Sequence, residues 1–264
     1  MERGLRPSFR FCEISTEILL GKTKMLKLIV PCHGDNSDNF RNLISSIDTQ
    51  DLAPEKYEVF FCEDVVEDSF RKQLEQVKGS KFLVENHRRK RLFGLFNICR
   101  VLDDLVRTEE DSEETIIGIL DSDDYLWGKN CFSNIINEYK KGFDCVWTAN
   151  EWEGLGLNHS GPLAKDCDVY KHPWVTSHFK TFKLSDYKSV PKKNFKNGDG
   201  KWFEACYDQA LMLPILHNVI TRGGRTKFLN KVHYIYRGNI KEESEYRQKQ
   251  LEYESFIRTR GYLK

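Results

Sequence analysis

Ile116-Ile117-Gly118-Ile119-Leu120 is followed directly by Asp121-Ser122-Asp123-Asp124. The first five residues form a short apolar run, rich in β-branched side chains, which predicts a buried strand. Carboxylates at the carboxyl end of a buried parallel strand lie where α/β sheets bind their ligands. Their oxygens are hard ligands, which suit Mg²⁺ or Mn²⁺ better than zinc. A helix N-cap is the alternative interpretation, but three carboxylates after one strand favour a metal site.

Similar apolar runs alternate with amphipathic segments over the first half of the chain. The runs predict strands at 25–31, 57–62, 82–84 and 116–120. Apolar residues at helical spacing predict three helices between them: one capped by Asn36 or Ser37, one over 70–77 and one over about 95–106. This alternation is typical of a mostly parallel sheet flanked by helices, so we expect an α/β fold.

The pattern changes after residue 150. Residues 151–197 are richer in His, Pro, Gly and Lys and predict loops. A helix over 202–217, a strand over 232–236 and a charged helix over about 242–259 are expected to follow. We find no internal repeat and no flexible linker, so a single continuous domain is expected. Residues 1–24 have mixed charge and little periodicity, which indicates an N-terminal arm.

Composition narrows the class of protein. Lys plus Arg number 41 against 40 Asp plus Glu, which argues against a protein that coats nucleic acid. No apolar run approaches the roughly 20 residues that span a bilayer, and residues 1–24 lack the apolar core of a secretion signal. The eight cysteines are scattered, without a Cys-x-x-Cys pair, and several lie in apolar stretches. We therefore expect reduced, buried cysteines and a cytoplasmic protein.

Several motifs together resemble the family 2 glycosyltransferases of GT-A fold. Ile29-Val30-Pro31 looks like the end of that family's first strand, and Glu63-Asp64 resembles its acidic nucleoside-binding pair. Asn97, three residues after Gly94, is similar to the segment before the metal strand, and Asp121 to Asp124 matches the D-x-D-D form of the D-x-D motif. Later segments resemble a bacterial and viral subgroup: Ser177 to Phe182, Tyr207 to Ala210 followed by Pro214, and Tyr234 to Arg237.

The resemblance covers about residues 25–240 and implies a domain organisation. Residues 25–127 would form the nucleotide-sugar half and 128–240 the acceptor half, followed by a C-terminal helix within 241–264. The sequence departs from the family pattern at Cys32-His33-Gly34-Asp35, at Lys180, where an Arg is expected, and at His217-Asn218. These positions are expected to face sugar and acceptor, so they bear on the substrate more than on the fold.

The resemblance also implies a function: metal-dependent transfer of a sugar, with inversion, from a nucleotide-diphosphate donor such as a UDP-sugar to a carbohydrate hydroxyl. Asp64 would hold the base or ribose, Asp121 the ribose, and Asp123 with Asp124 a Mn²⁺ or Mg²⁺ ion on the diphosphate. Pro31 and Asn97 are further candidates for donor binding, and the candidates for a phosphate or acceptor contact are His178, Lys180 and Arg237. Asp208 would be the catalytic base. Glu204, four residues earlier and expected on the same helical face, is the rival base or a partner that raises the pKa of Asp208.

Two alternatives remain open. One is a nucleotide-binding domain that keeps the fold without turnover. The other is a DNA-modifying glycosyltransferase that acts on a hydroxylated base. In that case the basic residues within 88–91 and 188–201 would follow a phosphate backbone and Trp202 would stack on a base. The near-neutral charge of the chain favours a carbohydrate acceptor instead.

Overall fold

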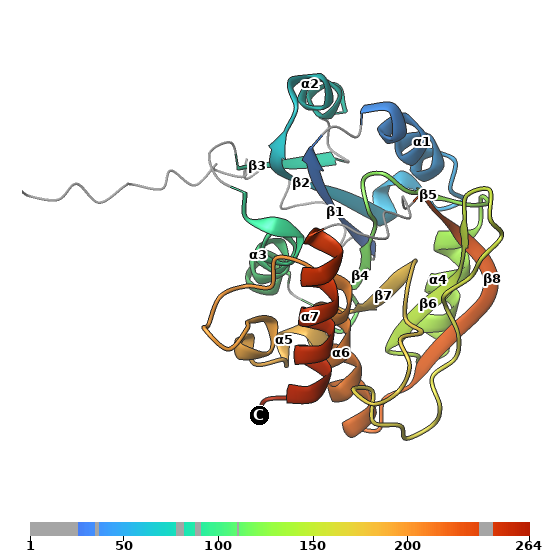
Figure 1. Cartoon of the computed structure of the whole chain (residues 1–264). Helices are drawn as coiled ribbons and strands as arrows, with labels where there is room; N and C mark the ends of the chain where they lie inside the picture. The colour runs from blue at the N-terminus through green and yellow to red at the C-terminus, as the bar shows by residue number, and fades with distance from the viewer. Residues whose placement is uncertain (1–25, 35–36, 78–81, 88–90, 110, 238–244) are drawn as a thin grey trace, which may run out of the picture.

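The computed structural model describes residues 26–34, 37–77, 82–87, 91–109, 111–237 and 245–264 (Figure 1). The expected arm at 1–24 and the proposed cap Asn36 lie outside these residues. Eight strands form one sheet in the order β3-β2-β1-β4-β7-β6-β8-β5. The strands are β1 (Leu26–Gly34), β2 (Tyr57–Val66), β3 (Phe82–His87), β4 (Ile116–Ile119), β5 (Tyr125–Leu126), β6 (Cys145–Trp152), β7 (Lys180–Lys183) and β8 (Thr226–Tyr236).

The sheet is mostly parallel, as the sequence predicts. β1 pairs in parallel with both β2 and β4, β2 pairs in parallel with β3, and β6 with β8. β7 runs antiparallel to its neighbours β4 and β6, and β5 runs antiparallel to β8. β4 therefore lies near the centre of the sheet, and the residues that follow it emerge at the edge where the parallel strands end.

Helices cover both faces of the sheet (Figure 1). Three helices pack on one face: α1 (Ser37–Asp48), α2 (Asp68–Gln76) and α4 (Cys131–Lys140). The other face carries α3 (Phe93–Thr108), α5 (Leu184–Lys188), α6 (Tyr207–Thr221) and α7 (Glu245–Arg260). Two short 3₁₀ turns, Pro54–Lys56 and Lys192–Phe195, complete the described elements.

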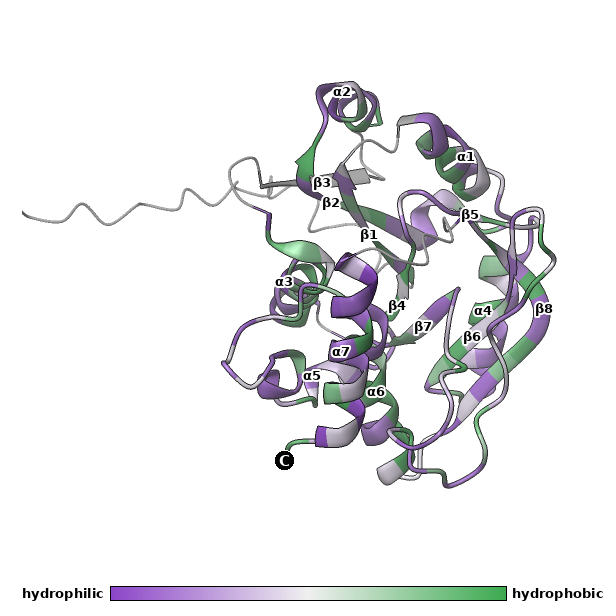
Figure 2. Ribbon diagram, viewed as in Figure 1, coloured by the Kyte–Doolittle hydropathy of each residue, from purple (hydrophilic) through white to green (hydrophobic). Residues whose placement is uncertain are grey.

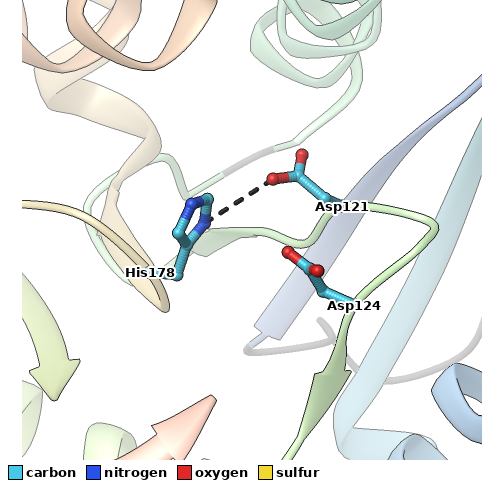
Figure 3. Close-up of side chains that lie close together, drawn as sticks. All are labelled: Asp121, Asp124 and His178. Carbon is cyan, nitrogen blue, oxygen red and sulfur yellow. Dashed lines mark ion pairs between the residues drawn. The ribbon is translucent and has the colours of Figure 1, made fainter. Parts of the chain in front are cut away.

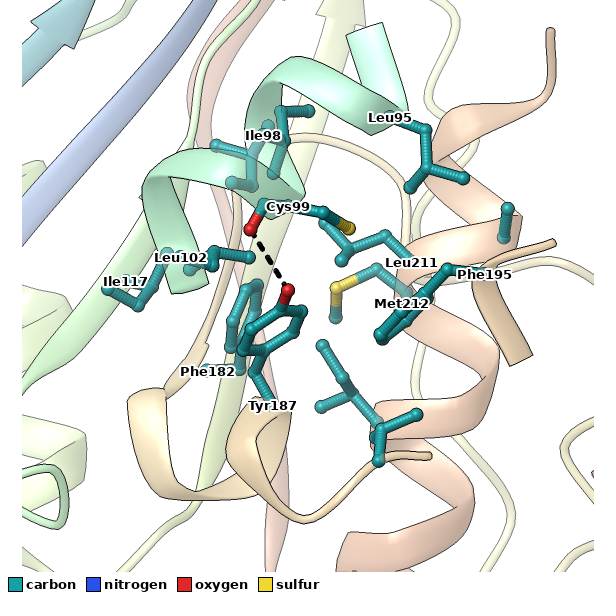
Figure 4. Packing of buried hydrophobic residues seen from close by; sticks show 14 of the residues in the cluster. Leu95, Ile98, Cys99, Leu102, Ile117, Phe182, Tyr187, Phe195, Leu211 and Met212 are labelled. Atoms are coloured by element: carbon teal, nitrogen blue, oxygen red, sulfur yellow. Dashed lines mark hydrogen bonds between the residues drawn. The ribbon is translucent and has the colours of Figure 1, made fainter. Parts of the chain in front are cut away.

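Alternation along the central strands builds the two cores. Leu28 and Val30 of β1 point to the face of α1, whereas Ile29 points to the face of α3, because successive strand residues alternate between faces. Figure 2 shows apolar residues in central strands such as β4 and mostly hydrophilic residues along the outer helix α7. Figure 4 shows the core between α3 and α6, where the Tyr187 hydroxyl donates a 3.1 Å hydrogen bond to the Cys99 carbonyl.

Sequence patterns miss β6, β7, α4 and α5, and they place the start of α6 too early. The helix expected over 202–217 begins at Tyr207, because Cys206 adopts a left-handed conformation with φ 57°. Trp202 instead forms an isolated bridge with Lys196. β8 begins at Thr226, six residues before the expected strand.

The seven described cysteines are free, and six of them are buried, which confirms the expectation of reduced core thiols for these residues. Among the described helices, none is both long enough and apolar enough to cross a membrane.

Candidate functional site

The loop Asp121 to Asp124 leaves the carboxyl end of β4, where the sequence places it. Ser122 and Asp124 are buried, and Asp121 and Asp123 are half-buried. The loop begins as a turn, in which the Asp124 amide donates a 3.3 Å hydrogen bond to the Asp121 carbonyl. Its carboxylates therefore project from the middle of the sheet edge rather than from an exposed loop.

The end of β8 holds the buried carboxylate of this loop. The Tyr234 hydroxyl donates to Asp124 Oδ2 at 2.7 Å, and the Arg237 amide donates to Asp124 Oδ1 at 2.7 Å. The same Tyr234 hydroxyl accepts the Asp121 amide at 3.2 Å. One tyrosine thus ties both ends of the loop to a strand from the second half of the chain.

Asp121 meets two further elements. Its Oδ1 accepts a hydrogen bond from the hydroxyl of Tyr207, the first residue of α6. Its Oδ2 lies 3.6 Å from His178 Nδ1, and Figure 3 shows the imidazole facing this carboxylate. The imidazole of His178 stacks on Tyr234 and Tyr236, with ring centroids 4.7 and 5.2 Å away. The aromatic stack fixes the direction in which the imidazole faces Asp121.

Burial is the main influence on the protonation of Asp121, Asp124 and His178. It raises the pKa of Asp121, which Lys180 opposes, and it raises the pKa of Asp124 well above 3.8, with Asp121 and Asp123 adding to the effect. Burial lowers the pKa of His178 well below 6.5, and the positive charge of Lys180 lowers it further. The imidazole is therefore neutral. Carboxylates crowded in this way gain from a cation that neutralises their charge.

Asp121, Asp124 and His178 fit a divalent metal. One ligand atom from each lies within 4.8 Å of the others. Carboxylate oxygens suit Mg²⁺ and Mn²⁺, and a neutral imidazole nitrogen in the same set favours Mn²⁺. The sequence predicts Asp123 and Asp124 as ligands, and the structure brings Asp124 together with Asp121 and His178.

Asp123 lies beside this group rather than within it. Burial raises its pKa, which its own backbone amide and Arg237 oppose. In the described part of the chain no hydrogen bond or ion pair joins its carboxylate to another side chain. Its oxygens are therefore open to a ligand, in contrast to those of Asp124.

Asp64 is buried, and its carboxylate already accepts hydrogen bonds. The amides of Leu92 and Phe93 donate to its two oxygens at 2.8 and 2.7 Å, just where α3 begins. The neighbouring Glu63 accepts from Arg71 Nε at 2.7 Å. Asp64 thus anchors the start of α3, and a contact with a nucleoside would use its remaining lone pairs.

Asn97 and Pro31 lie next to this region. The Asn97 side chain is 1 % exposed, and among the described residues no partner reaches its amide oxygen or nitrogen. An unsatisfied buried amide is costly and marks a position where a ligand or water would be favourable. Pro31, half-buried, packs near Gly94: a Cβ added to that glycine would lie 3.8 Å from Pro31 Cβ.

Asp208 occupies the first turn of α6, next to Tyr207. Burial raises its pKa, with Asp121 and Glu254 adding to the effect and Lys180 opposing it. Lys180 is fully buried, with its Nζ 3.4 Å from His178 Nδ1 and 5.3 Å from the centre of the Tyr207 ring. It therefore acts as an internal countercharge for the acidic groups.

The expected helical pairing of Glu204 with Asp208 is wrong. Glu204 lies three residues before α6 begins, so the two carboxylates do not share a helical face. Its carboxylate forms an ion pair with Lys249 of α7 instead.

Arg237 contributes its backbone rather than a free side chain. Its Nε lies 2.9 Å from Glu153 Oε2, its Nη1 donates to Asn39 Oδ1 at 2.5 Å, and its guanidinium lies over the ring of Tyr125. The side chain thus joins three segments at the rim of the site.

Comparisons with solved structures agree with this architecture. S. aureus TarS 1-349 in complex with UDP-GlcNAc matches with a TM-score of 0.60 at 17% identity, over 84% of this chain and 60% of that one. The mannosyltransferase PcManGT from Pyrobaculum calidifontis, in complex with GDP-Man and Mn²⁺, matches with a TM-score of 0.56 at 13% identity, over 88% and 62%. The chain has the GT-A glycosyltransferase fold. This confirms the fold that the sequence motifs predict.

The chain spans about 60% of the length of these GT-A structures. No family model matches the sequence, and no curated protein matches it.

The basic segments of the DNA alternative gain no support from the GT-A structure. Residues 88–90 lie outside the described part. Lys192 forms an ion pair with Asp103 and donates a hydrogen bond to the hydroxyl of Tyr187. Trp202 packs edge-on against Phe96, with ring centroids 5.5 Å apart, so part of its surface is already covered.

Two side chains that contact the loop after β4 are not predicted from the sequence. Tyr207 and Tyr234 lie in segments that resemble the family, but the resemblance assigned roles only to their charged neighbours Asp208 and Arg237. A tyrosine inside an apolar strand or at a helix start is usual for a core. Only the fold shows that both hydroxyls are directed at the loop after β4.

Proposed function

We propose that this chain is a nucleotide-sugar-dependent glycosyltransferase. The observation that carries the proposal is the convergence of Asp121, Asp124 and His178 at the carboxyl end of β4 within a GT-A fold. The neighbours bound to UDP-GlcNAc and to GDP-Man support a nucleotide-sugar donor. We propose a UDP-sugar as the donor and a carbohydrate hydroxyl as the acceptor.

The loop after β4 would receive the diphosphate. Asp124, Asp121 and His178 would hold Mn²⁺ or Mg²⁺, with the open carboxylate of Asp123 as a further ligand, and the bound ion would neutralise charge on the leaving diphosphate. Tyr234 and Tyr207 would keep the carboxylates in place before any donor arrives. Asp64 and Asn97 would lie on the nucleoside side, with Pro31 behind them.

Asp208 is proposed as the base. The acceptor oxygen would bond to the anomeric carbon, the bond from that carbon to the diphosphate oxygen would break, and the acceptor proton would move to Asp208. A single displacement of this kind inverts the anomeric configuration. The raised pKa of Asp208 supports the role, because a base with a higher pKa takes a proton more readily. Glu204 is the weaker candidate, since Lys249 already pairs with it.

A screen of nucleotide-sugar hydrolysis with Mn²⁺ tests this function and identifies the donor. Wild-type protein should release the nucleoside diphosphate from at least one donor, and Asp123→Ala should abolish the metal-stimulated part without unfolding the protein. NMR of the product should show the inverted anomeric configuration. Full activity in EDTA would refute metal dependence, and a retained configuration would refute the single displacement.

A further inference from the structure

One stripe of α7 faces the body of the protein. Ile257 is 1 % exposed, and the Arg260 guanidinium donates to the carbonyls of Asn194 and Lys196. Tyr253 packs edge-on against Phe203 at 5.1 Å, and Lys249 pairs with Glu204. These residues recur every three to four positions, which is the spacing of one helical face.

Tyr246 continues this stripe by one turn, three residues before Lys249. Lys249 forms an ion pair with Glu204, which lies three residues before the first residue of α6. The preceding turn of α7, which carries Tyr246, therefore extends beyond the start of α6. Asp208 occupies that end of α6. In agreement, burial raises the pKa of Tyr246, and the carboxylates of Asp208 and Asp121 are the next largest causes of the increase.

Tyr246 is the exposed aromatic residue of this stripe. The residue is 52% exposed, which is unusual for a large side chain on the body-facing stripe of a helix. The ion pair between Lys249 and Glu204, one turn further along the stripe, places this exposed aromatic side chain beside the segment that leads into α6. An exposed aromatic side chain near the start of α6 offers a flat apolar surface beside the proposed base.

We propose that the ring of Tyr246 is a stacking platform for the acceptor and that it selects acceptors with a ring, as a pyranose has, at the position of the reacting hydroxyl. This inference rests on the proposed function and on Asp208 as the base. Carbon-bound hydrogens on one face of a pyranose would pack on the aromatic ring while a hydroxyl at the rim reaches the carboxylate. The acceptor would thus lie between α7 and the first turn of α6.

The test separates acceptor binding from donor binding. With the donor found in the hydrolysis screen, transfer is measured to methyl and p-nitrophenyl glycosides for the wild type, Tyr246→Ala and Tyr246→Phe. Tyr246→Ala should raise the acceptor KM about tenfold, the scale of one lost aromatic contact, and change the donor KM less than about threefold. Tyr246→Phe keeps the ring and should stay within about threefold of wild type in both.

Leu251→Ala is the matched control, because Leu251 is an equally exposed apolar residue of α7 outside the stripe. It should leave both KM values unchanged. An acceptor KM for Tyr246→Ala equal to that of wild type, or an equal rise for Leu251→Ala, would overturn the proposal. So would an equal rise in acceptor and donor KM.

A second measurement keeps this inference distinct from the proposed function. Saturation-transfer NMR reports binding of the same methyl glycosides without donor or turnover. Signal in the wild type that is lost in Tyr246→Ala but kept in Tyr246→Phe supports the platform even if no nucleotide sugar is hydrolysed. Equal signals in all three proteins refute it even if the protein proves to be a glycosyltransferase.

Discussion

The hydroxyl of Tyr234 donates a 2.7 Å hydrogen bond to Asp124, so a side chain near the end of β8 fixes the buried carboxylate that follows β4. The tyrosine itself is fully buried. Its ring also supports His178, with which it stacks. A single side chain therefore positions two of the three groups that face one another at the candidate metal centre.

Tyr234→Phe should lower the free energy of unfolding by about 1–3 kcal/mol, because the buried Asp124 loses a hydrogen-bond donor while the ring remains. Affinity for Mn²⁺ and nucleoside diphosphate should fall as well. Urea denaturation and calorimetric titration measure the two effects. Tyr125→Phe, which removes an exposed hydrogen bond to Glu153, should cost less than about 0.5 kcal/mol. Equal losses for the two variants would contradict the importance of Tyr234.

Stability should depend on pH through the acidic loop. Asp121 and Asp124 have folded-state pKa values raised above 3.8, so the metal-free folded protein holds more protons than the unfolded chain as the pH rises past that value. Their contribution to stability therefore declines with rising pH. Because a metal binds the ionised carboxylates, the increase in Tm on adding Mn²⁺ should be larger at pH 7 than at pH 5. An increase in Tm that is equal at both values would argue against binding at this loop.

Asp208→Asn should reduce transfer by about 10² or more while donor affinity stays within a few-fold, since the base acts on the acceptor. The acidic limb of the wild-type pH–rate profile should lie above 3.8, because the raised pKa keeps Asp208 protonated to higher pH. Glu204→Gln serves as the comparison and should cost much less. Steady-state kinetics from pH 4 to pH 8 check both statements. Near-normal transfer by Asp208→Asn would exclude it as the base.

Asp64→Ala should destabilise the protein by about 1–2 kcal/mol, because two amides at the start of α3 lose their acceptor. Asp68→Ala at the start of α2 removes a carboxylate whose side chain is 88% exposed and should cost about 0.5 kcal/mol or less. Thermal and urea denaturation compare the two. If Asp64→Ala keeps its stability but loses nucleotide binding, the anchoring role is secondary to contact with the donor.

Gly118→Ala should destabilise the centre of the sheet by about 1–3 kcal/mol through overpacking. A Cβ at this position would lie 2.6 Å from Phe179 Cζ and 2.9 Å from Leu28 Cδ2. Gly161→Ala is the control, because its nearest contact would be an ordinary 3.7 Å from Val175. Unfolding midpoints that fall equally for both variants would contradict this packing argument.

The strands with continuous apolar runs could be predicted from sequence, and β7 could not. β7 reads Lys-Thr-Phe-Lys, which resembles a surface loop, yet it lies between β4 and β6 near the middle of the sheet. Lys180 is buried there because acidic groups surround it, and Thr181 because its hydroxyl donates to the Val146 carbonyl at 2.7 Å. Partners from distant segments make these polar residues suitable for the interior, and no local pattern shows them.

The candidate site also has one part that the sequence predicts and one part that only the structure shows. The D-x-D-D loop follows an apolar strand and could be located from sequence. The ligand grouping could not, because His178 approaches Asp121 only through the stacking of its ring on Tyr234 and Tyr236. The sequence pattern predicts a helix from residue 202 and therefore puts Glu204 inside it. The backbone turns at Cys206, so the helix begins only at Tyr207.

The bond between Tyr234 and Asp124 also has a consequence for biosynthesis. The two residues are 110 positions apart, and a ribosome delivers the chain from its N-terminus. While the intervening residues are being translated, the acidic loop has left the ribosome without the tyrosine that restrains it. A message truncated before β8 would therefore encode the whole acidic motif and still yield a polypeptide whose carboxylates lack their support.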